Sequence, residues 1–296
     1  MEALPRYEYR YRRPQRRRTR AWRVLLALAL VLAVAYPFFE AFHLNEQEHT
    51  TSAQNLPQNL RNLKVVFLSD IHQNAWDSQA RTDWVIKTVN GLSPDLVLLG
   101  GDYAADPASA VKFFENLPLI QARLGSFGVL GSGDRGESDT DLMALEQAMQ
   151  EAGVTPLVNE VAKLKVGQAD LYVAGIDDLD AGHPDVAGVA ARVSADDYVI
   201  LLGNNPDLLT DAVKAVDKNG KTHWFDLALF GHTHGGQITL FGKPLLSVFS
   251  PKTSSRYLSG WLAENRADIL ISNGVGTLYV PMRLFAPAQI HLIRLR

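Results

Sequence analysis

The chain has 296 residues, of which 47% are hydrophobic and 21% are charged, so it can bury a full core and is not typical of a disordered protein. It contains no cysteine, which excludes disulfides, thiolate metal ligands and a thiol nucleophile. Any metal must therefore be held by histidine, carboxylate or similar groups.

The N-terminus combines a basic arm with an apolar run. Residues 1–23 contain nine arginines, and residues 24–39 carry no charge. This order predicts a single-pass signal-anchor over residues 24–41, with the arm in the cytoplasm and the remainder extracytoplasmic at the cell membrane. The uncharged run is somewhat shorter than the roughly 20 residues of a full span. Two alternatives stay open, because Ala33-Val34-Ala35 also matches a signal-peptide cleavage site and the arginines alone are also typical of a nucleic-acid-binding arm.

The remainder of the chain is acidic. The arm holds nine of the 29 basic and two of the 32 acidic residues, which leaves residues 24–296 with 20 basic and 30 acidic residues and a formal net charge of −10. This balance, without a basic stripe, argues against nucleic acid as a partner of the domain, and the apolar run beside the arm favours a membrane as the partner of the arm.

A polar segment and then an alternating pattern follow the apolar run. Residues 42–61 are rich in asparagine and glutamine and are interpreted as a linker that holds a domain at 62–296 off the membrane. In that domain apolar strands alternate with helical spacing, which predicts an α/β fold, and the denser strands after residue 155 predict mixed sheets. Strands are expected at 63–68, 96–99, 127–130, 155–158, 163–166, 170–174, 198–202, 227–230, 268–272 and 289–295, and helices at 80–92, 108–116, 139–152 and 206–216.

Polar clusters follow five of these apolar strands. Ligand sites in α/β folds form at the carboxyl ends of strands, so the clusters are expected to converge. In an extended backbone residues i and i+2 point the same way, which would aim both side chains of each D-x-H or H-x-H pair at one site. Each motif alone is also typical of a turn-forming aspartate or an exposed loop histidine, but the ordered series favours a metal site. The clusters contain Asp70 and His72, Asp102, Ser132 to Arg135, Asn204, and His232 and His234.

The order of these motifs resembles the calcineurin-like metallophosphoesterases over residues 62–296. Gly235-Gly236-Gln237, Tyr257-x-x-Gly260 and Asn273-Gly274-x-Gly276 make the chain most similar to the membrane-anchored bacterial branch related to phosphodiesterases that act on UDP-2,3-diacylglucosamine. The resemblance implies a four-layer α/β/β/α sandwich of two mixed sheets, two divalent metal ions and hydrolysis of a phosphate ester by a metal-activated water.

Transferring the family's ligands by position implies two unequal metal sites. The first would contain Asp70, His72, the bridging Asp102 and His234. The second would contain Asp102, His232, Ser132 and Asn204, where Ser132 replaces the family's usual asparagine and Asn204 its usual histidine. Mn, Fe, Zn, Mg and Ca all remain candidates; one ion is expected at the first site, and weak binding or a hard ion such as Mg or Ca at the second.

The catalytic acid and the phosphate-binding residue are less well defined. Gly133 occupies the family's general-acid position, so no catalytic acid is assigned. Arg135 is a candidate for holding a phosphate oxygen, with a solvated loop charge as its alternative. His183 and His223 are candidate substitute acids, with a turn residue and a strand-edge residue as the preferred alternatives.

The expected function is a metal-dependent phosphoesterase that hydrolyses a mono- or diester of a phosphorylated small molecule or lipid. A lipid-linked or nucleotide-sugar substrate is favoured because the anchor holds the site near the bilayer, and the replaced ligands predict reduced or altered activity. The alternative is a non-catalytic module of the same fold that binds a phosphorylated ligand or a partner protein.

Overall fold

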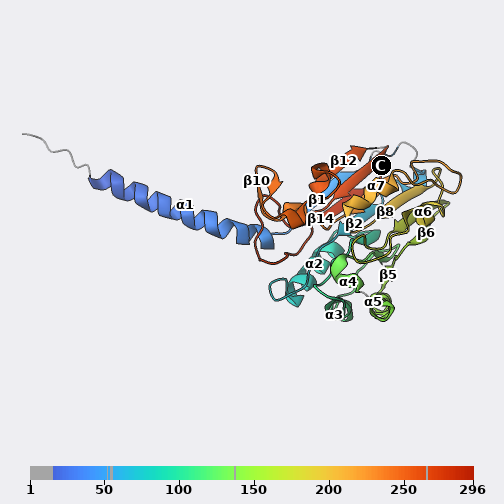
Figure 1. Ribbon diagram of the computed structural model, residues 1–296, viewed down its shortest axis with the longest axis horizontal. Helices are drawn as coiled ribbons and strands as arrows, with labels where there is room; N and C mark the ends of the chain where they lie inside the picture. The colour runs from blue at the N-terminus through green and yellow to red at the C-terminus, as the bar shows by residue number, and fades with distance from the viewer. Residues whose placement is uncertain (1–15, 52, 54–55, 137, 265) are drawn as a thin grey trace, which may run out of the picture.

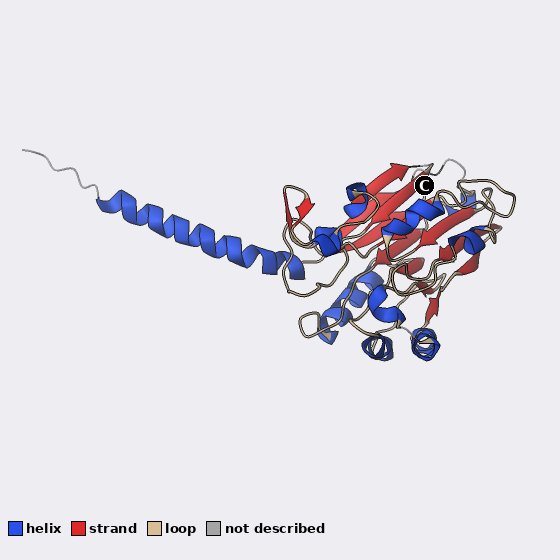
Figure 2. Cartoon of the chain, in the orientation of Figure 1, coloured by secondary structure: helices blue, strands red, loops and turns tan. Residues whose placement is uncertain are grey.

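Two six-stranded sheets form the centre of the molecule, and one long helix projects from it (Figures 1 and 2). The structure is a computed structural model that describes residues 16–296 except 52, 54–55, 137 and 265, so most of the basic arm lies outside the described residues. The helices are α1 (Arg16–Phe42), α2 (Gln79–Gly91), α3 (Pro107–Glu115), α4 (Ser132–Arg135), α5 (Asp139–Glu151), α6 (Val186–Ala190) and α7 (Leu209–Ala212). Short 3-10 helices are η1 (Gln58–Leu60), η2 (Pro206–Leu208), η3 (His234–Gly236), η4 (Ser247–Phe249) and η5 (Ser255–Leu258).

The first sheet has the strand order β1-β14-β2-β3-β4-β5 and is parallel except between β14 and β2. The second has the order β12-β13-β9-β8-β7-β6 and is antiparallel at both outer pairs. A small hairpin pairs β10 with β11. The strands are β1 (Asn45–Thr50), β2 (Lys64–Leu68), β3 (Leu96–Leu99), β4 (Ser126–Gly128), β5 (Val154–Pro156), β6 (Glu160–Val166), β7 (Ala169–Gly175), β8 (Tyr198–Leu202), β9 (Leu227–Phe230), β10 (Thr239–Leu240), β11 (Lys243–Pro244), β12 (Gly260–Glu264), β13 (Ala267–Ile271) and β14 (Gln289–Arg294).

Three apolar cores separate four layers of helices and sheets. Val66 and Leu68 of β2 pack under α2, α3 and α5, whereas Val65 and Phe67 of the same strand point into the space between the sheets. The opposite face of the second sheet packs on α6 and α7. The central strands are buried on both faces, which explains their continuous apolar runs. The α/β/β/α sandwich of two mixed sheets is therefore confirmed, and the strands expected at 96–99, 198–202 and 227–230 begin and end where they were predicted.

The segment interpreted as a linker contains a strand. β1 pairs in parallel with β14 and extends the first sheet by one strand. His49 on β1 hydrogen-bonds His291 through their ring nitrogens (3.1 Å) and stacks on Trp261 at a centroid distance of 4.7 Å. The strand is polar and only half-buried along one side, so it lacks the apolar alternation by which strands are recognised. Residues 45–50 thus belong to the folded domain, which corrects the linker interpretation.

The apolar helix runs directly into the domain. Ala21–Phe42 is 22 residues long, with a mean hydropathy of 2.2 in its most apolar window, and is long and apolar enough to cross a membrane. Its last turn is docked: Glu40 and Ala41 are buried, and the backbone N–H of Ala286 donates to Glu40 Oε1 at 2.8 Å. The helix expected at 206–216 is shorter than predicted, ending at Ala212 after a 3-10 turn.

Candidate metal centre

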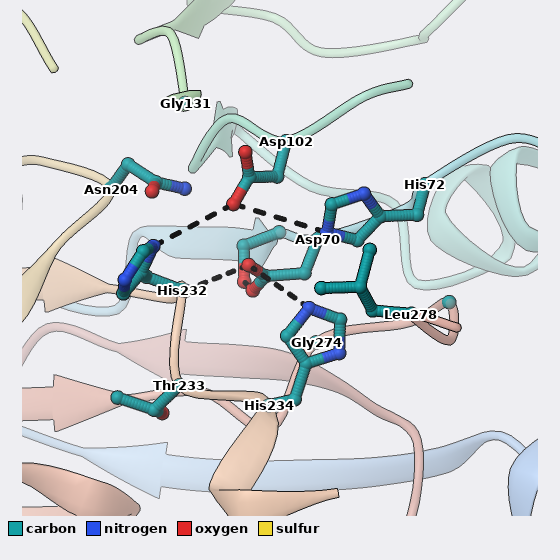
Figure 3. Close-up of polar contacts among 12 residues, drawn as sticks. Asp70, His72, Asp102, Gly131, Asn204, His232, Thr233, His234, Gly274 and Leu278 are labelled. Atoms are coloured by element: carbon teal, nitrogen blue, oxygen red, sulfur yellow. Dashed lines mark hydrogen bonds and ion pairs between the residues drawn. The ribbon is translucent and has the colours of Figure 1, made fainter. Parts of the chain in front are cut away.

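A pocket of about 600 Å³ lies where the carboxyl ends of strands from both sheets converge. It collects side chains that follow β2, β3, β4 and β9. Figure 3 shows those that follow β2, β3 and β9. Its polar lining residues include His72, Asp102, Ser132, His232 and His234.

The most buried part of the site is the cluster of Asp70, His72 and His234. One ligand atom from each lies within 4.8 Å of the others, and the two imidazole rings stack at a centroid distance of 4.9 Å. Both ring nitrogens of His72 and Nε2 of His234 are buried without a hydrogen-bond partner in the described structure. Unpartnered buried polar atoms are costly, and a divalent cation would satisfy one ring nitrogen of each histidine together with a carboxylate oxygen of Asp70. The donor set therefore fits a metal ion.

Left-handed backbone brings these ligands together. Asp70, His72, Asp102, His232 and His234 all have φ between 43° and 68°, a conformation that costs roughly 1–3 kcal/mol for a non-glycine residue. The extended-strand argument for the D-x-H and H-x-H pairs is thus wrong in its geometry, because the side chains meet through sharp turns. The glycines beside them allow the close approach: a Cβ on Gly231 would lie 2.3 Å from Asp70 Oδ2.

Asp102 lies between two histidines. Its Oδ2 is 3.9 Å from His72 Nε2 and 3.9 Å from His232 Nδ1, the position of a carboxylate that could contact two ions (Figure 3). Its backbone N–H donates to Asp134 Oδ2 at 2.7 Å, and Asp134 also accepts from the N–H of Tyr103 and Gly131. Asp134 is therefore a buried positioning residue of the β3 and β4 loops.

Burial and like charge set the electrostatics of the site. Burial raises the pKa of Asp70 to about 8, and the charge of Asp102 raises it as well. Burial likewise raises the pKa of Asp134 well above its usual range. It lowers the pKa of His72 and, more strongly, of His234, which keeps both rings neutral, as metal ligands must be. Carboxylates so crowded and desolvated fit a site whose cation supplies the missing positive charge.

Oxygen donors dominate the other half of the site. Asn204 is fully buried and donates from Nδ2 to Gly100 O at 2.8 Å, which leaves its Oδ1 buried without a partner within the described residues. Figure 3 shows Asn204 on the same side as His232, facing Asp102. Ser132 is exposed on the pocket wall. An ion in this half would meet one imidazole and several oxygens, the donor set of a hard cation.

Asp178 and Asp180 were not identified from the sequence. Asp178 is fully buried, and its Oδ1 accepts from the N–H of Asp180 and Ala181 while its Oδ2 has no partner in the described part of the chain. Burial raises the pKa of Asp178 to about 6, with a further contribution from the charge of Asp102. Asp180 Oδ2 lies 4.0 Å from His232 Nε2. The pattern that predicted the other candidates also applies to these two residues, because both follow the strand expected at 170–174.

A buried arginine also helps to position the histidine loop. Arg283 is fully buried and donates to the carbonyl oxygens of His234, Asn273, Gly276 and Ala286, so one side chain ties the histidine loop to the 273–286 segment. An isolated arginine in an irregular segment carries no pattern that predicts this role.

The structure corrects the interpretation of Arg135. Its Nε lies 3.1 Å from Asp177 Oδ1 and 3.2 Å from Oδ2 in a buried ion pair. Arg135 is thus not a solvated loop charge, and it is not among the residues that line the pocket. The pair connects α4, after β4 of the first sheet, to the loop after β7 of the second.

The structure also shows the surroundings of the general-acid position, Gly133, and of the two candidate substitutes. A Cβ at Gly133 would lie 2.6 Å from the backbone oxygen of Ala104, so a histidine there requires the backbone to move. His183 and His223 are exposed and are not among the residues that line the pocket.

Comparison with known proteins defines the class. A family model described as calcineurin-like phosphoesterase matches residues 63–236. The chain belongs to this family and is a hydrolase of phosphate esters that works with divalent metals. The match confirms the family expected from the strand-end motifs.

Three relatives show how far the similarity extends. YkuE of Bacillus subtilis, an uncharacterized metallophosphoesterase, is 29% identical over 264 residues, 88% of each chain. The phosphodiesterase YaeI of Escherichia coli is 29% identical over 238 residues, covering 78% of this chain and 82% of YaeI. A transmembrane protein with a metallophosphoesterase domain from Bos taurus is 28% identical over 250 residues, covering 79% of this chain but 53% of the relative.

Proposed function

We propose that the chain is a membrane-anchored phosphoesterase with one strong and one weak metal site. The observation that carries the proposal is the cluster of Asp70, His72 and His234, with its buried and unpartnered ligand atoms. These three residues and Asp102 would hold the first ion. A bound divalent ion would supply Lewis acidity and positive charge for attack of water on the phosphorus.

The second ion would depend on Asp102, His232 and Asn204, with Ser132 at the pocket wall. Asp178 would add a negative charge beside them. Such a site suits Mg²⁺ or Ca²⁺ better than a borderline ion, because three of the four donors are oxygens.

The family's usual general acid would be missing from this site. Gly133 cannot act as an acid, and its neighbourhood leaves no room for a side chain. Loss of a positioned acid lowers rates by about 10²–10⁴-fold, so esters with good leaving groups should be favoured over poor ones.

The class of substrate and the orientation of the chain in the membrane are part of the same proposal. α1 would cross the membrane once, with the basic arm in the cytoplasm and the domain extracytoplasmic. The similarity of the motifs to phosphodiesterases that act on UDP-2,3-diacylglucosamine supports a lipid-linked or nucleotide-sugar phosphodiester. The docked end of α1 supports a domain held at the bilayer surface.

The test combines metal content with hydrolysis of bis-p-nitrophenyl phosphate in Mn²⁺, Mg²⁺, Zn²⁺ or Ca²⁺. We expect turnover in at least one metal, and its loss in Asp102→Ala but not in the surface control Asp83→Asn. Absence of turnover in every metal would instead favour a module that binds a phosphorylated ligand.

A further inference from the structure

Exposed apolar side chains gather beside the β10–β11 hairpin. We call this group the collar; it consists of Leu240, Phe241, Leu245, Leu246, Tyr279 and Phe285. Phe241 is 94% exposed, and Tyr279 and Phe285 are 69% and 66% exposed. Large apolar groups exposed together mark an interaction surface.

The backbone is specialised to present the three aromatic rings. Phe241, Tyr279 and Phe285 have φ of 50°, 65° and 56°, which is uncommon for bulky residues. Backbone hydrogen bonds join their two segments: Thr239 N donates to Leu284 O, and Leu284 N donates to Gln237 O. The hairpin and residues 279–285 therefore form one continuous surface.

This surface lies against the end of the apolar helix. The N–H of Arg283 donates to Pro37 O at 2.9 Å, and that of Ala286 donates to Glu40 Oε1, so the residues on either side of Phe285 are fixed to the last two turns of α1. Arg81 also contacts this end of α1, through Ala41 O and the ring of Phe42. Figure 1 shows the β10 hairpin beside the point where α1 enters the domain. A membrane crossed by α1 would place the collar at its surface.

The collar is also continuous with the pocket. Tyr279 belongs to both, and Val248, Phe249 and Leu278 line the same wall of the pocket. The ring of Phe249 lies 5.3 Å from that of His234 and 6.4 Å from that of Tyr279. An apolar path therefore leads from the collar to the metal ligands.

We propose that the collar lies in the interfacial layer of the bilayer and that the pocket receives its substrate from there. The substrate is then the phosphate ester of an amphiphile, whose acyl chains stay among the collar side chains while its phosphate reaches Asp70, His72 and His234. Tyrosine favours this interfacial layer, and phenylalanine and leucine side chains are buried at the boundary between headgroups and acyl chains. The continuity of the collar with α1 selects a bilayer, rather than a second copy of the chain, as its occupant. The substrate part of this inference rests on the proposed function, whereas the location of the collar does not.

The absence of cysteine makes the location directly measurable. The full chain is reconstituted in nanodiscs of phosphatidylcholine and phosphatidylglycerol, with a nitroxide on a single cysteine introduced as Phe241→Cys, Phe285→Cys or, as an exposed control on α5, Met143→Cys. We expect labels at 241 and 285 to collide more with oxygen and less with a water-soluble nickel chelate than the label at 143. Equal nickel accessibility at all three positions, or spin–spin broadening between copies at 241, would overturn the proposal.

A second measurement tests the route of the substrate. Phe241→Asp combined with Leu245→Asp is compared with the exposed control Leu119→Asp in the same nanodiscs. We expect kcat/KM for a lipid phosphodiester to fall about 10-fold while hydrolysis of bis-p-nitrophenyl phosphate stays unchanged. Equal loss on both substrates, or no loss on the lipid, would overturn entry from the bilayer. No hydrolysis of either ester by the unaltered chain would refute the proposed function, and the nitroxide measurement would still decide the location of the collar.

Discussion

Both halves of the metal centre are formed by residues that follow strands, but the two halves differ in their side chains. Asp70, His72 and His234 are at most 7% exposed and offer a carboxylate and two neutral imidazoles. On the other side of Asp102, the His232 side chain is 25% exposed, and the neighbouring donor is the amide of Asn204. Residues that follow strands form both halves, so the difference in expected affinity comes from donor chemistry and burial. A fold can therefore keep a site's shape while its sequence changes the ion that the site binds.

The largest effect is expected from Asp70→Asn, which removes the anionic ligand of the buried half. Metal content should fall to near zero and phosphodiester hydrolysis by on the order of 10³-fold, because the charge that stabilises the transition state is lost. Mass spectrometry of the bound metal and a kinetic assay measure these changes, with Asp83→Asn as the control. Retention of one tightly bound ion by Asp70→Asn would show that this half is not the primary site.

Arg135→Met should destabilise the protein, because the ion pair of Arg135 with Asp177 connects loops that follow strands of the two sheets. Removing one member of a buried ion pair costs about 3–5 kcal/mol, because the remaining charge stays desolvated. Urea unfolding measures the change in the free energy of unfolding. The matched control is Arg123→Met, which breaks the exposed pair with Asp95 and should cost less than about 1 kcal/mol. Equal costs for the two variants would argue against a structural role for Arg135.

Asn204→His should strengthen the weaker half. An added imidazole ligand is expected to raise the affinity for a second Zn²⁺ or Mn²⁺ by about 10–100-fold while the first ion is unaffected. Calorimetric titration of metal-free protein resolves the two steps, with Asn219→His as the control for a surface histidine. Ser132→Asn can be added, whereas Gly133→His is expected to fail because of the contact with Ala104 O. An unchanged second step would place Asn204 outside the ion's reach.

The smallest effect is expected from Asp178→Asn, which removes one charge and keeps the size of the side chain. The second ion should bind about 10-fold more weakly, and the first with unchanged affinity. The same titration measures both, with Asp211→Asn as the control. Weaker binding of the first ion alone would show that Asp178 acts on the first site and not on the second.

Much of the fold could be predicted because its central strands are buried on both faces. Their apolar runs at 96–99, 198–202 and 227–230 are local signals that need no knowledge of a partner. The ligand candidates could be found for a related reason, since each follows such a strand directly. Asp178 and Asp180 obey the same rule and were overlooked, whereas Arg283 follows no strand and could not be found this way.

The sequence by itself determined the α/β class, the family motifs, the strand-end candidates and the apolar helix, since each depends on neighbouring residues. Only the tertiary structure decided the pairing of β1 with β14, the ion pair of Arg135 with Asp177, the packing of α1 and the position of the collar. Each of these joins segments far apart in the chain through polar or irregular residues. Local periodicity cannot encode such contacts, because their stability comes from a partner that only folding supplies.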